Sequence, residues 1–245
     1  MYIKVGFMYS SKNDNIYKCQ NITKNMIARQ NVFLDYGDLI AHHDFNEQTL
    51  ARAHRLVIDY LHERGKNHIT LDALSEAHKK VTGEYLADRK ETLKEWTMPQ
   101  FTGKILTALN LRNRRSLCQD ISDAYKAIDH DTRLMPETRE NLDALAGESA
   151  QLSIISNCPH DSIYQELSLL GIRGFFNDIV LSCEVGVRKP RPKIYQIAIK
   201  RAGIRPYEGV FFSHDQEEVD GALAVGMQAH LAKNLAEVLA KLKTS

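Results

Sequence analysis

The spacing of apolar residues divides the chain into two parts with different patterns. Between residues 46 and 145, apolar residues recur at intervals of three and four, as in EQTLARAHRLVIDYLHERG, which ends at Gly65, a natural helix stop. The next stretch opens at Thr70, a suitable N-cap, and further helices are expected over roughly 100–128 and 136–146. No strand pattern interrupts this block, so we predict that it is all-helical.

Short apolar runs and helical stretches alternate in the rest of the chain. Strands are predicted in VFLD, which ends at Asp35, and in the later segments QLSIISN, DIVLSCEVG, GVFFSHD and QAHLA. The helices predicted between them include two that end at Gly171 and Gly203. Such alternation with short connections favours a parallel sheet with helices on both faces, that is, a doubly wound, Rossmann-like α/β fold.

The two patterns together predict an α/β domain that is interrupted by a helical insert. We expect an α/β core formed by residues 31–45 and 146–245, with an all-helical domain, residues 46–145, inserted after the first strand. Residues 1–30 lack the apolar run of a signal peptide and are expected to form an extension outside the core.

Composition narrows the range of partners. A net charge of +1, with 43% hydrophobic and 26% charged residues, gives no electrostatic reason to expect nucleic acid or an anionic membrane surface. No apolar run approaches the ~18 residues that a membrane helix needs. The 4 cysteines form no CxxC pair, which argues against a zinc site or a disulfide framework and suits the cytosol. We expect a cytoplasmic protein with a small-molecule substrate; its oligomeric state is left open.

Polar residues follow several of the predicted strands. Asp35 follows VFL, Ser156 and Asn157 follow SII, and residues 213–215 (Ser-His-Asp) follow VFF, while Lys189 precedes a helix. Taken singly, each has an ordinary explanation as a cap, a turn or a solvated charge. Ligands of open parallel sheets bind beyond the carboxyl ends of the strands, so these residues in this order indicate a site there.

The same segments resemble the motifs of the haloacid dehalogenase (HAD) superfamily over roughly residues 31–245. VFLDYGDLI is similar to the first motif, IISN to the second, RKPRPKIY to the third and FFSHDQEEVDGALAVGM, in part, to the fourth. The resemblance implies that the helical block is a cap domain inserted after the first motif. It also implies a hydrolase.

In the phosphatases of this family, an aspartate at the position of Asp35 attacks phosphorus and forms an aspartyl-phosphate. The resemblance therefore implies a phosphatase of a small phosphorylated metabolite with Asp35, Ser156 and Lys189 as catalytic residues. Ser156 would bind a phosphoryl oxygen, with Asn157 beside it in the substrate site, and Lys189 would pair with Asp35 and neutralise charge on the transferred group.

The family phosphatases also bind Mg²⁺, and the implied ligands here are Asp35, the carbonyl of Gly37 and Asp215. Two departures bear on this expectation. Gly37 stands where most of these phosphatases carry a second aspartate that acts as acid and base. Ser213 and His214 occupy the usual acid positions of the fourth motif, and imidazole is a poor ligand for a hard cation.

Those departures keep two alternatives open. The metal-independent 2-haloacid dehalogenases of the family have Ser, Asn and an acid in the fourth stretch, where Ser213, Asp215 and Glu218 have comparable spacing. They normally carry Thr where this chain has Leu39, so that match is also imperfect. The other alternative is a catalytically degenerate protein that keeps the fold for binding.

Overall fold

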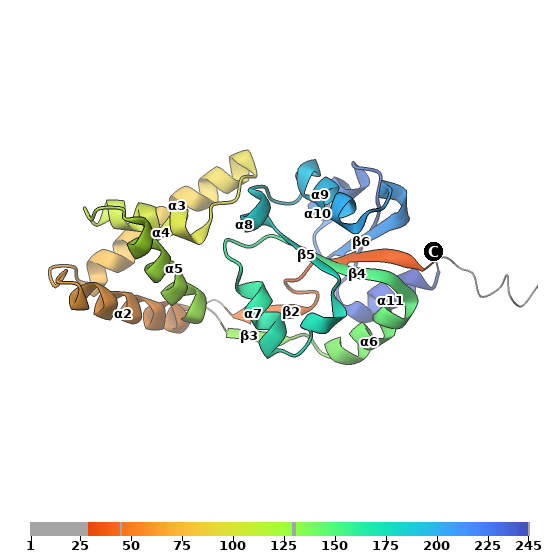
Figure 1. The fold of residues 1–245 in the computed structure, drawn as a ribbon, viewed down its shortest axis with the longest axis horizontal. Coiled ribbons are helices and arrows are strands. Elements are labelled where there is room, and N and C mark those ends of the chain that lie inside the picture. Colours follow the sequence, from red (N-terminus) through yellow and green to blue (C-terminus); the bar gives the residue numbers. More distant parts are fainter. Residues whose placement is uncertain (1–28, 45, 129–130, 245) are drawn as a thin grey trace, which may run out of the picture.

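The computed structural model describes residues 29–44, 46–128 and 131–244, and its central feature is a parallel sheet. Figure 1 shows this sheet in one half of the molecule, with a block of helices in the other. The five strands lie in the order β5-β4-β1-β6-β7, and every neighbouring pair is parallel. They are β1 (Gln30–Leu34), β4 (Ser149–Ser156), β5 (Asp178–Leu181), β6 (Gly209–Ser213) and β7 (Gln228–Leu231). The predicted α/β fold is confirmed, and each of the five strands overlaps a predicted segment. The strands β1 and β4 each begin two residues before the predicted segment, and the second half of DIVLSCEVG is a short helix, Ser182–Val185, rather than strand.

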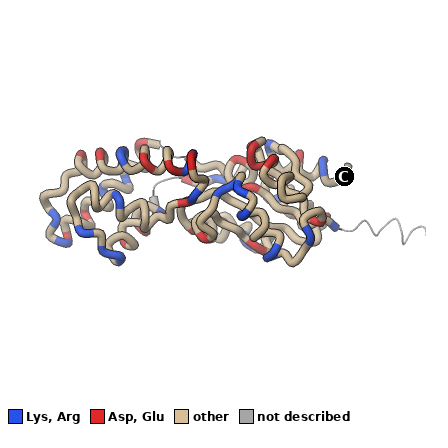
Figure 2. The backbone as a smooth tube through the Cα atoms, turned by 90° about the horizontal axis from the view of Figure 1, so that it is seen from above, with Lys and Arg blue, Asp and Glu red and all other residues tan. Residues whose placement is uncertain are grey.

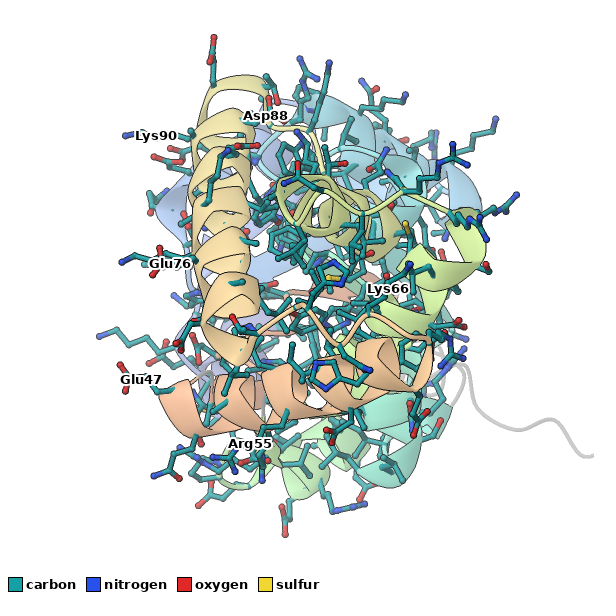
Figure 3. All side chains as sticks on the ribbon, turned by 90° about the vertical axis from the view of Figure 1, so that its left-hand side faces the viewer. Glu47, Arg55, Lys66, Glu76, Asp88 and Lys90 are labelled. Atoms are coloured by element: carbon teal, nitrogen blue, oxygen red, sulfur yellow. The ribbon has the colours of Figure 1, made fainter. Side chains whose placement is uncertain are left out.

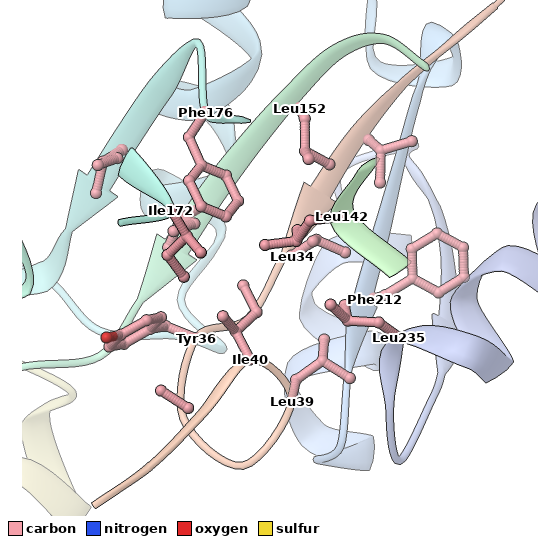
Figure 4. Packing of buried hydrophobic residues seen from close by; sticks show 14 of the residues in the cluster. Leu34, Tyr36, Leu39, Ile40, Leu142, Leu152, Ile172, Phe176, Phe212 and Leu235 are labelled. Atoms are coloured by element: carbon pink, nitrogen blue, oxygen red, sulfur yellow. The ribbon is translucent and has the colours of Figure 1, made fainter. Parts of the chain in front are cut away.

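Helices cover both faces of the sheet because successive strand residues point to opposite sides. Val32 and Leu34 of β1 belong to one buried cluster, whereas Phe33, between them, belongs to another. The first cluster, drawn in Figure 4, includes residues of α6, α7 and α11, and the second includes residues of α9 and α10. These helices, together with the short α8, are α6 (Thr138–Glu148), α7 (Ser162–Leu169), α8 (Ser182–Val185), α9 (Pro192–Ala202), α10 (Gln216–Leu223) and α11 (Leu235–Leu242). A strand buried on both faces needs a continuous apolar run, which explains why Val32, Phe33 and Leu34 are all apolar.

The helical insert has a hydrophobic core of its own. It consists of α2 (Glu47–Glu63), α3 (Leu71–Thr92), α4 (Met98–Ala108) and α5 (Arg115–Ile128), whose buried residues form a separate cluster. Thr70 caps α3 as predicted, since its hydroxyl accepts a hydrogen bond from Ala73 N at 3.1 Å. The single helical stretch expected over roughly 100–128 is instead α4 and α5, separated by a turn in which Asn110 has a φ of 57°.

Charged side chains cover the outside of both regions. Figure 2 shows acidic and basic residues interspersed along the whole molecule, in keeping with a net charge of +1. Figure 3 views the insert from its far end, where Glu47, Arg55 and Glu76 project outward from α2 and α3. The polar positions of the helical pattern therefore form a solvated face.

A small two-stranded antiparallel sheet joins the insert to the core. The strands β2 (Ala41–Asp44) and β3 (Asp131–Leu134) pair with each other, with Ala41 opposite Leu134 and Asp44 opposite Asp131. The prediction that no strand interrupts residues 46–145 is therefore wrong at β3. The sequence DTRL is too short and too polar to show a period of two, and it becomes a strand only because β2 lies beside it.

Most of the predicted extension over residues 1–30 lies outside the described residues. Gln30, the last residue of that range, already begins β1. Within the described part of the chain, no helix has the length and apolar character needed to cross a membrane.

Candidate active site

A cleft of about 560 Å³ lies between the carboxyl edge of the sheet and the end of α3. The residues predicted from sequence for the site all line it, namely Asp35, Gly37, Ser156, Asn157, Lys189 and Asp215. The insert contributes Leu86, Arg89, Lys90 and Leu93 to the opposite wall. The sheet therefore brings together residues up to 180 positions apart in the sequence, in the way that the strand-end pattern predicts.

Asp35 is held firmly at the end of β1. Its side chain is 7% exposed, and its Oδ1 accepts hydrogen bonds from Lys189 Nζ at 2.5 Å and from the backbone N of Tyr36 at 2.8 Å. Its Oδ2 lies 3.1 Å from His214 Nδ1 and 3.4 Å from Ser213 Oγ. Nitrogen donors therefore face both oxygens of this carboxylate.

These contacts keep Asp35 ionised. Burial alone would raise its pKa, but the charge of Lys189 and the hydrogen bonds from His214 and Lys189 outweigh that effect and lower the pKa below its usual 3.8. Burial alone would likewise lower the pKa of Lys189, but the charges of Asp35 and Glu218 raise it above 10.5. A carboxylate that is charged at neutral pH and largely shielded from water is suited to nucleophilic attack.

Glu218 is a central member of the site that appeared in the sequence analysis only within the dehalogenase alternative. Its Oε2 lies 2.7 Å from Lys189 Nζ and accepts a hydrogen bond from Ser213 Oγ, also at 2.7 Å. Burial, reinforced by the charge of Asp35, raises the pKa of Glu218 above 4.5 despite the attraction of Lys189. Lys189 is thus shared by two carboxylates with opposite pKa shifts, and Glu218 is the one that takes up a proton first on acidification.

Asn157 binds protein groups on three sides. Its Oδ1 accepts a hydrogen bond from the backbone N of Lys189 at 2.8 Å, and its Nδ2 donates to the carbonyl of Lys189 and to Glu218 Oε1. The amide thus holds the Lys189 loop beside the end of β4. The predicted contact of Asn157 with substrate stays a prediction, while Ser156, 3% exposed, lines the cleft as expected.

The arrangement around Asp35 does not fit a magnesium ion. Mg²⁺ requires oxygen ligands, whereas His214 occupies the Oδ2 side of Asp35 and Lys189 the Oδ1 side. Asp215 Oδ1 accepts the backbone hydrogen bond of Glu217 at 2.8 Å and so caps α10. Among the described residues, no group of three or more His, Cys, Asp or Glu side chains is placed to hold a metal ion. These contacts thus do not favour the magnesium site expected at Asp35, Gly37 and Asp215, and that site stays a prediction.

A second polar cluster on the cleft wall was not predicted. Glu166 Oε2 lies 3.0 Å from His43 Nε2 and accepts a hydrogen bond from Tyr36 Oη at 3.1 Å, while Glu166 Oε1 accepts one from Ser162 Oγ at 2.6 Å. The adjacent His42 turns away to Asp38 and Asp44. This cluster fixes Tyr36, the neighbour of Asp35, and its acid lies too far along the chain from His43 for any sequence spacing to indicate it.

The fold and the strand-end carboxylate define a class of protein, and that class is also found by comparison with known families. A model of the haloacid dehalogenase-like hydrolases matches residues 67–232, and the chain belongs to this family. The matched range contains Ser156, Lys189 and Glu218, and it begins after Asp35.

Characterised relatives of two kinds are similar to parts of the chain. A glyceraldehyde 3-phosphate phosphatase of Methanothermobacter thermautotrophicus is 34% identical over 103 residues, which are 42% of this chain and 46% of that protein. An (S)-2-haloacid dehalogenase of a Pseudomonas species is 30% identical over 124 residues, 51% of this chain and 52% of that protein. The chain thus matches about half the length of each of these relatives.

Solved structures extend the similarity of fold to most of the chain. A 2-haloacid dehalogenase from Pseudomonas syringae pv. Tomato has a TM-score of 0.63 at 18% identity, covering 88% of this chain and 98% of that one. A HAD phosphatase from Thermococcus onnurineus has a TM-score of 0.55 at 21% identity, covering 87% and 97%. At these identities the likeness shows the fold, including the inserted helices, and leaves the reaction open.

Proposed function

We propose that this protein is a hydrolase that transfers part of a small anionic substrate onto Asp35 and then hydrolyses the resulting ester. The observation that carries the proposal is the buried, ionised Asp35 with Lys189 Nζ at 2.5 Å, on the floor of a cleft that also contains Ser156. The proposed nucleophile, Asp35, and its partner Lys189 are those expected from the sequence, with Glu218 added as the second partner of Lys189.

The reaction has two displacement steps. In the first, an oxygen of Asp35 forms a bond to the electrophilic centre and the leaving group departs with the electron pair of the broken bond. Lys189 remains beside Asp35 and compensates the charge that spreads onto the leaving group. In the second, water attacks the ester, the bond between Asp35 and the transferred group breaks, one proton of the water passes to the solvent, and Asp35 regains its negative charge as the product leaves. Helices α2 to α5, which run from Glu47 to Ile128, act as the cap that closes the cleft and excludes bulk water, whereas α6, expected within the cap, packs on the core sheet.

Displacement at carbon is the reaction that this geometry supports best. His214 and Lys189 donate to the two oxygens of Asp35 and supply positive charge from side chains alone, so neither step depends on a divalent ion. The substrate class would be a short carboxylic acid with a leaving group, such as a halide, on the adjacent carbon. Arg89 lines the cleft and can bind its carboxylate.

Phosphate monoester hydrolysis is the second candidate. It is supported by the 34% identical segment of a sugar-phosphate phosphatase and by the presence of Gly37 and Asp215 in the same cleft as Asp35. A magnesium-dependent form of this reaction requires His214 to leave the Oδ2 atom of Asp35, and Asp215 to turn from its cap toward the carboxylate.

One assay separates the candidates. Release of halide from 2-halo acids and of phosphate from sugar and nucleotide monophosphates is measured with a chelator and then with Mg²⁺, and Asp35→Asn serves as the blank. Halide release that persists in chelator supports displacement at carbon, and phosphate release that requires Mg²⁺ supports the phosphatase. If neither product forms, or if Asp35→Asn retains the activity, the proposed function is wrong.

A further inference from the structure

A buried carboxylate of the insert takes no part in the chemistry described so far. Glu95 lies in the loop between α3 and α4, and its side chain is 0% exposed. Its Oε1 accepts a hydrogen bond from Tyr85 Oη, within the insert, at 2.5 Å. Its Oε2 accepts hydrogen bonds from Ser182 Oγ at 2.6 Å and from Arg188, both of which belong to the core. Glu95 therefore directs one of its two oxygens into the other domain.

The contact with Arg188 fixes the loop that carries Lys189. Arg188 immediately precedes Lys189, and its backbone N donates to the carbonyl of Leu93 at 3.0 Å. Lys94 and Val187 form an isolated antiparallel bridge beside this bond. The insert thus fixes the segment that precedes Lys189 through main-chain hydrogen bonds and through a largely buried ion pair.

The contact with Ser182 fixes the loop that carries Ser156. Ser182 Oγ accepts a hydrogen bond from the backbone N of Cys158 at 2.8 Å, and Cys158 follows Ser156 by two residues. The backbone N of Met98, at the start of α4, donates to the carbonyl of Pro159 at 3.0 Å. The end of β4 is therefore tied to the insert through the same carboxylate.

We propose that Glu95 is a positioning residue that aligns the Ser156 and Lys189 loops from the insert, so that docking of the insert and assembly of the active site are one event. The kinetic part of this inference rests on the proposed function, whereas the structural part does not. Glu95 touches neither Asp35 nor the cleft, so it acts through Arg188 and Ser182.

The coupling has a simple physical origin. Neutralisation of Glu95 in the docked structure would leave Arg188 largely buried without its charged partner, and loss of one partner of a buried pair is strongly unfavourable. Charge-assisted hydrogen bonds from Arg188 and Ser182 to the same oxygen lose strength together when the carboxylate is neutralised. Replacement of Glu95 by glutamine keeps the shape and removes the charge, so it isolates this effect.

Amide hydrogen exchange measured by NMR on the full chain tests the structural part directly. In Glu95→Gln, exchange of the amides of Cys158 and Arg188 should accelerate by about tenfold or more, while the amides of β1 and β6 keep their protection. The matched control is Lys126→Gln, which removes another ion pair between insert and core, Lys126 to Asp161 at 2.7 Å, without reaching Arg188 or Ser182. It should leave both amides unchanged.

A second variant covers the case in which Glu95→Gln does not fold. Ser182→Ala removes only the branch to the Ser156 loop, so exchange should accelerate at Cys158 and not at Arg188. The inference is wrong if both amides keep their wild-type rates in Glu95→Gln, or if all core amides accelerate equally, because that result means only global destabilisation.

The kinetic arm distinguishes positioning from substrate binding. With any substrate that the wild-type protein turns over, Glu95→Gln should lower kcat by about tenfold or more with KM within about twofold, since Lys189 acts on the reacting group. An unchanged kcat would overturn the positioning role. If the wild-type protein has no turnover at all, the proposed function fails while the exchange experiment still decides the role of Glu95.

Discussion

The α/β core and the helical insert place their polar side chains in different ways. In the core, Asp35 and Ser156 follow strands that are buried on both faces, so the sheet itself fixes where these groups lie. In the insert, charged residues lie on solvated helix faces, and Arg89 reaches the cleft only because α3 ends beside it. A sheet edge defines positions to within hydrogen-bond distances, whereas a helix end offers a surface whose side chains can vary without cost to the fold.

This difference indicates how the functional roles are divided between the core and the insert. Under the proposed function, the groups that act on the reacting atoms come from the core, whereas Arg89 of the insert lines the opposite wall of the cleft. Each region also has a hydrophobic cluster with no members in common with the other. Changes in the two regions should therefore have separable effects, and four predictions test this, from the largest effect to the smallest.

The largest effect is expected at the nucleophile. Asp35→Asn should lower kcat by roughly 10³-fold or more, because the amide cannot form the ester. The change should leave the insert unaltered, as judged by amide exchange in α2 to α5. Trapping of a covalent adduct, detected by intact-protein mass spectrometry, should succeed in the wild type and fail in the variant. Turnover at an unchanged rate in Asp35→Asn would remove Asp35 from the mechanism.

Truncation of a buried leucine should destabilise one region at a time. Leu106 of the insert and Leu34 of the core are each 0% exposed, and removal of such side chains costs about 2–5 kcal/mol. Leu106→Ala should accelerate amide exchange chiefly in α4 and α5, while Leu34→Ala should act chiefly on the sheet. Equal acceleration in both regions for both variants would show that the two clusters unfold as one unit.

Substitution of a cleft residue of the insert should change binding more than chemistry. Arg89→Gln removes a cation that lines the cleft and should raise KM by about tenfold, with kcat nearly unchanged. Lys79→Gln, on the same helix but outside the cleft lining, is the matched control and should leave both constants as they are. A lower kcat with constant KM would place Arg89 among the groups that act on the reacting atoms.

The smallest effect concerns Glu218 and pH. The pKa of Glu218 in the folded protein lies above its usual 4.5. Between the usual pKa and the folded pKa, the folded protein binds more protons than the unfolded chain, so the free energy of unfolding falls as pH rises. Because glutamine does not titrate, the Tm of wild type relative to Glu218→Gln should decrease as the pH rises above 4.5 through the raised pKa of Glu218. Thermal unfolding of both proteins across that range measures the difference, and a constant difference would contradict the raised pKa.

The sequence predicted well those features that depend on local pattern. The strands β1, β4, β5 and β6 were found because each contains a short apolar run bounded by polar residues. The pairing of Lys189 with Asp35 was expected from the resemblance to the HAD motifs, and the two side chains do lie 2.5 Å apart. Pattern is enough where the fold itself does the positioning.

Features that depend on contacts between distant segments were not accessible in this way. Glu95 reads as one acid in a charged helical block, and only its burial against Ser182 and Arg188, 87 and 93 positions away, gives it a role. Glu166 reads as a polar position of an amphipathic helix until His43 is placed against it. The strand β3 has no pattern of its own and exists only through its partner β2.

The two-stranded sheet of β2 and β3 has a further consequence. The chain leaves the core and returns to it along two paired strands, so that Asp44 and Asp131 are neighbours across the ladder. Cross-strand neighbours of this kind are about 4.5–5.5 Å apart, a gap that a tight turn can close. Evolution can therefore lengthen, replace or delete everything between these two residues without disturbing the register of the main sheet. A change in the length of the insert would therefore leave the two points at which it joins the core side by side.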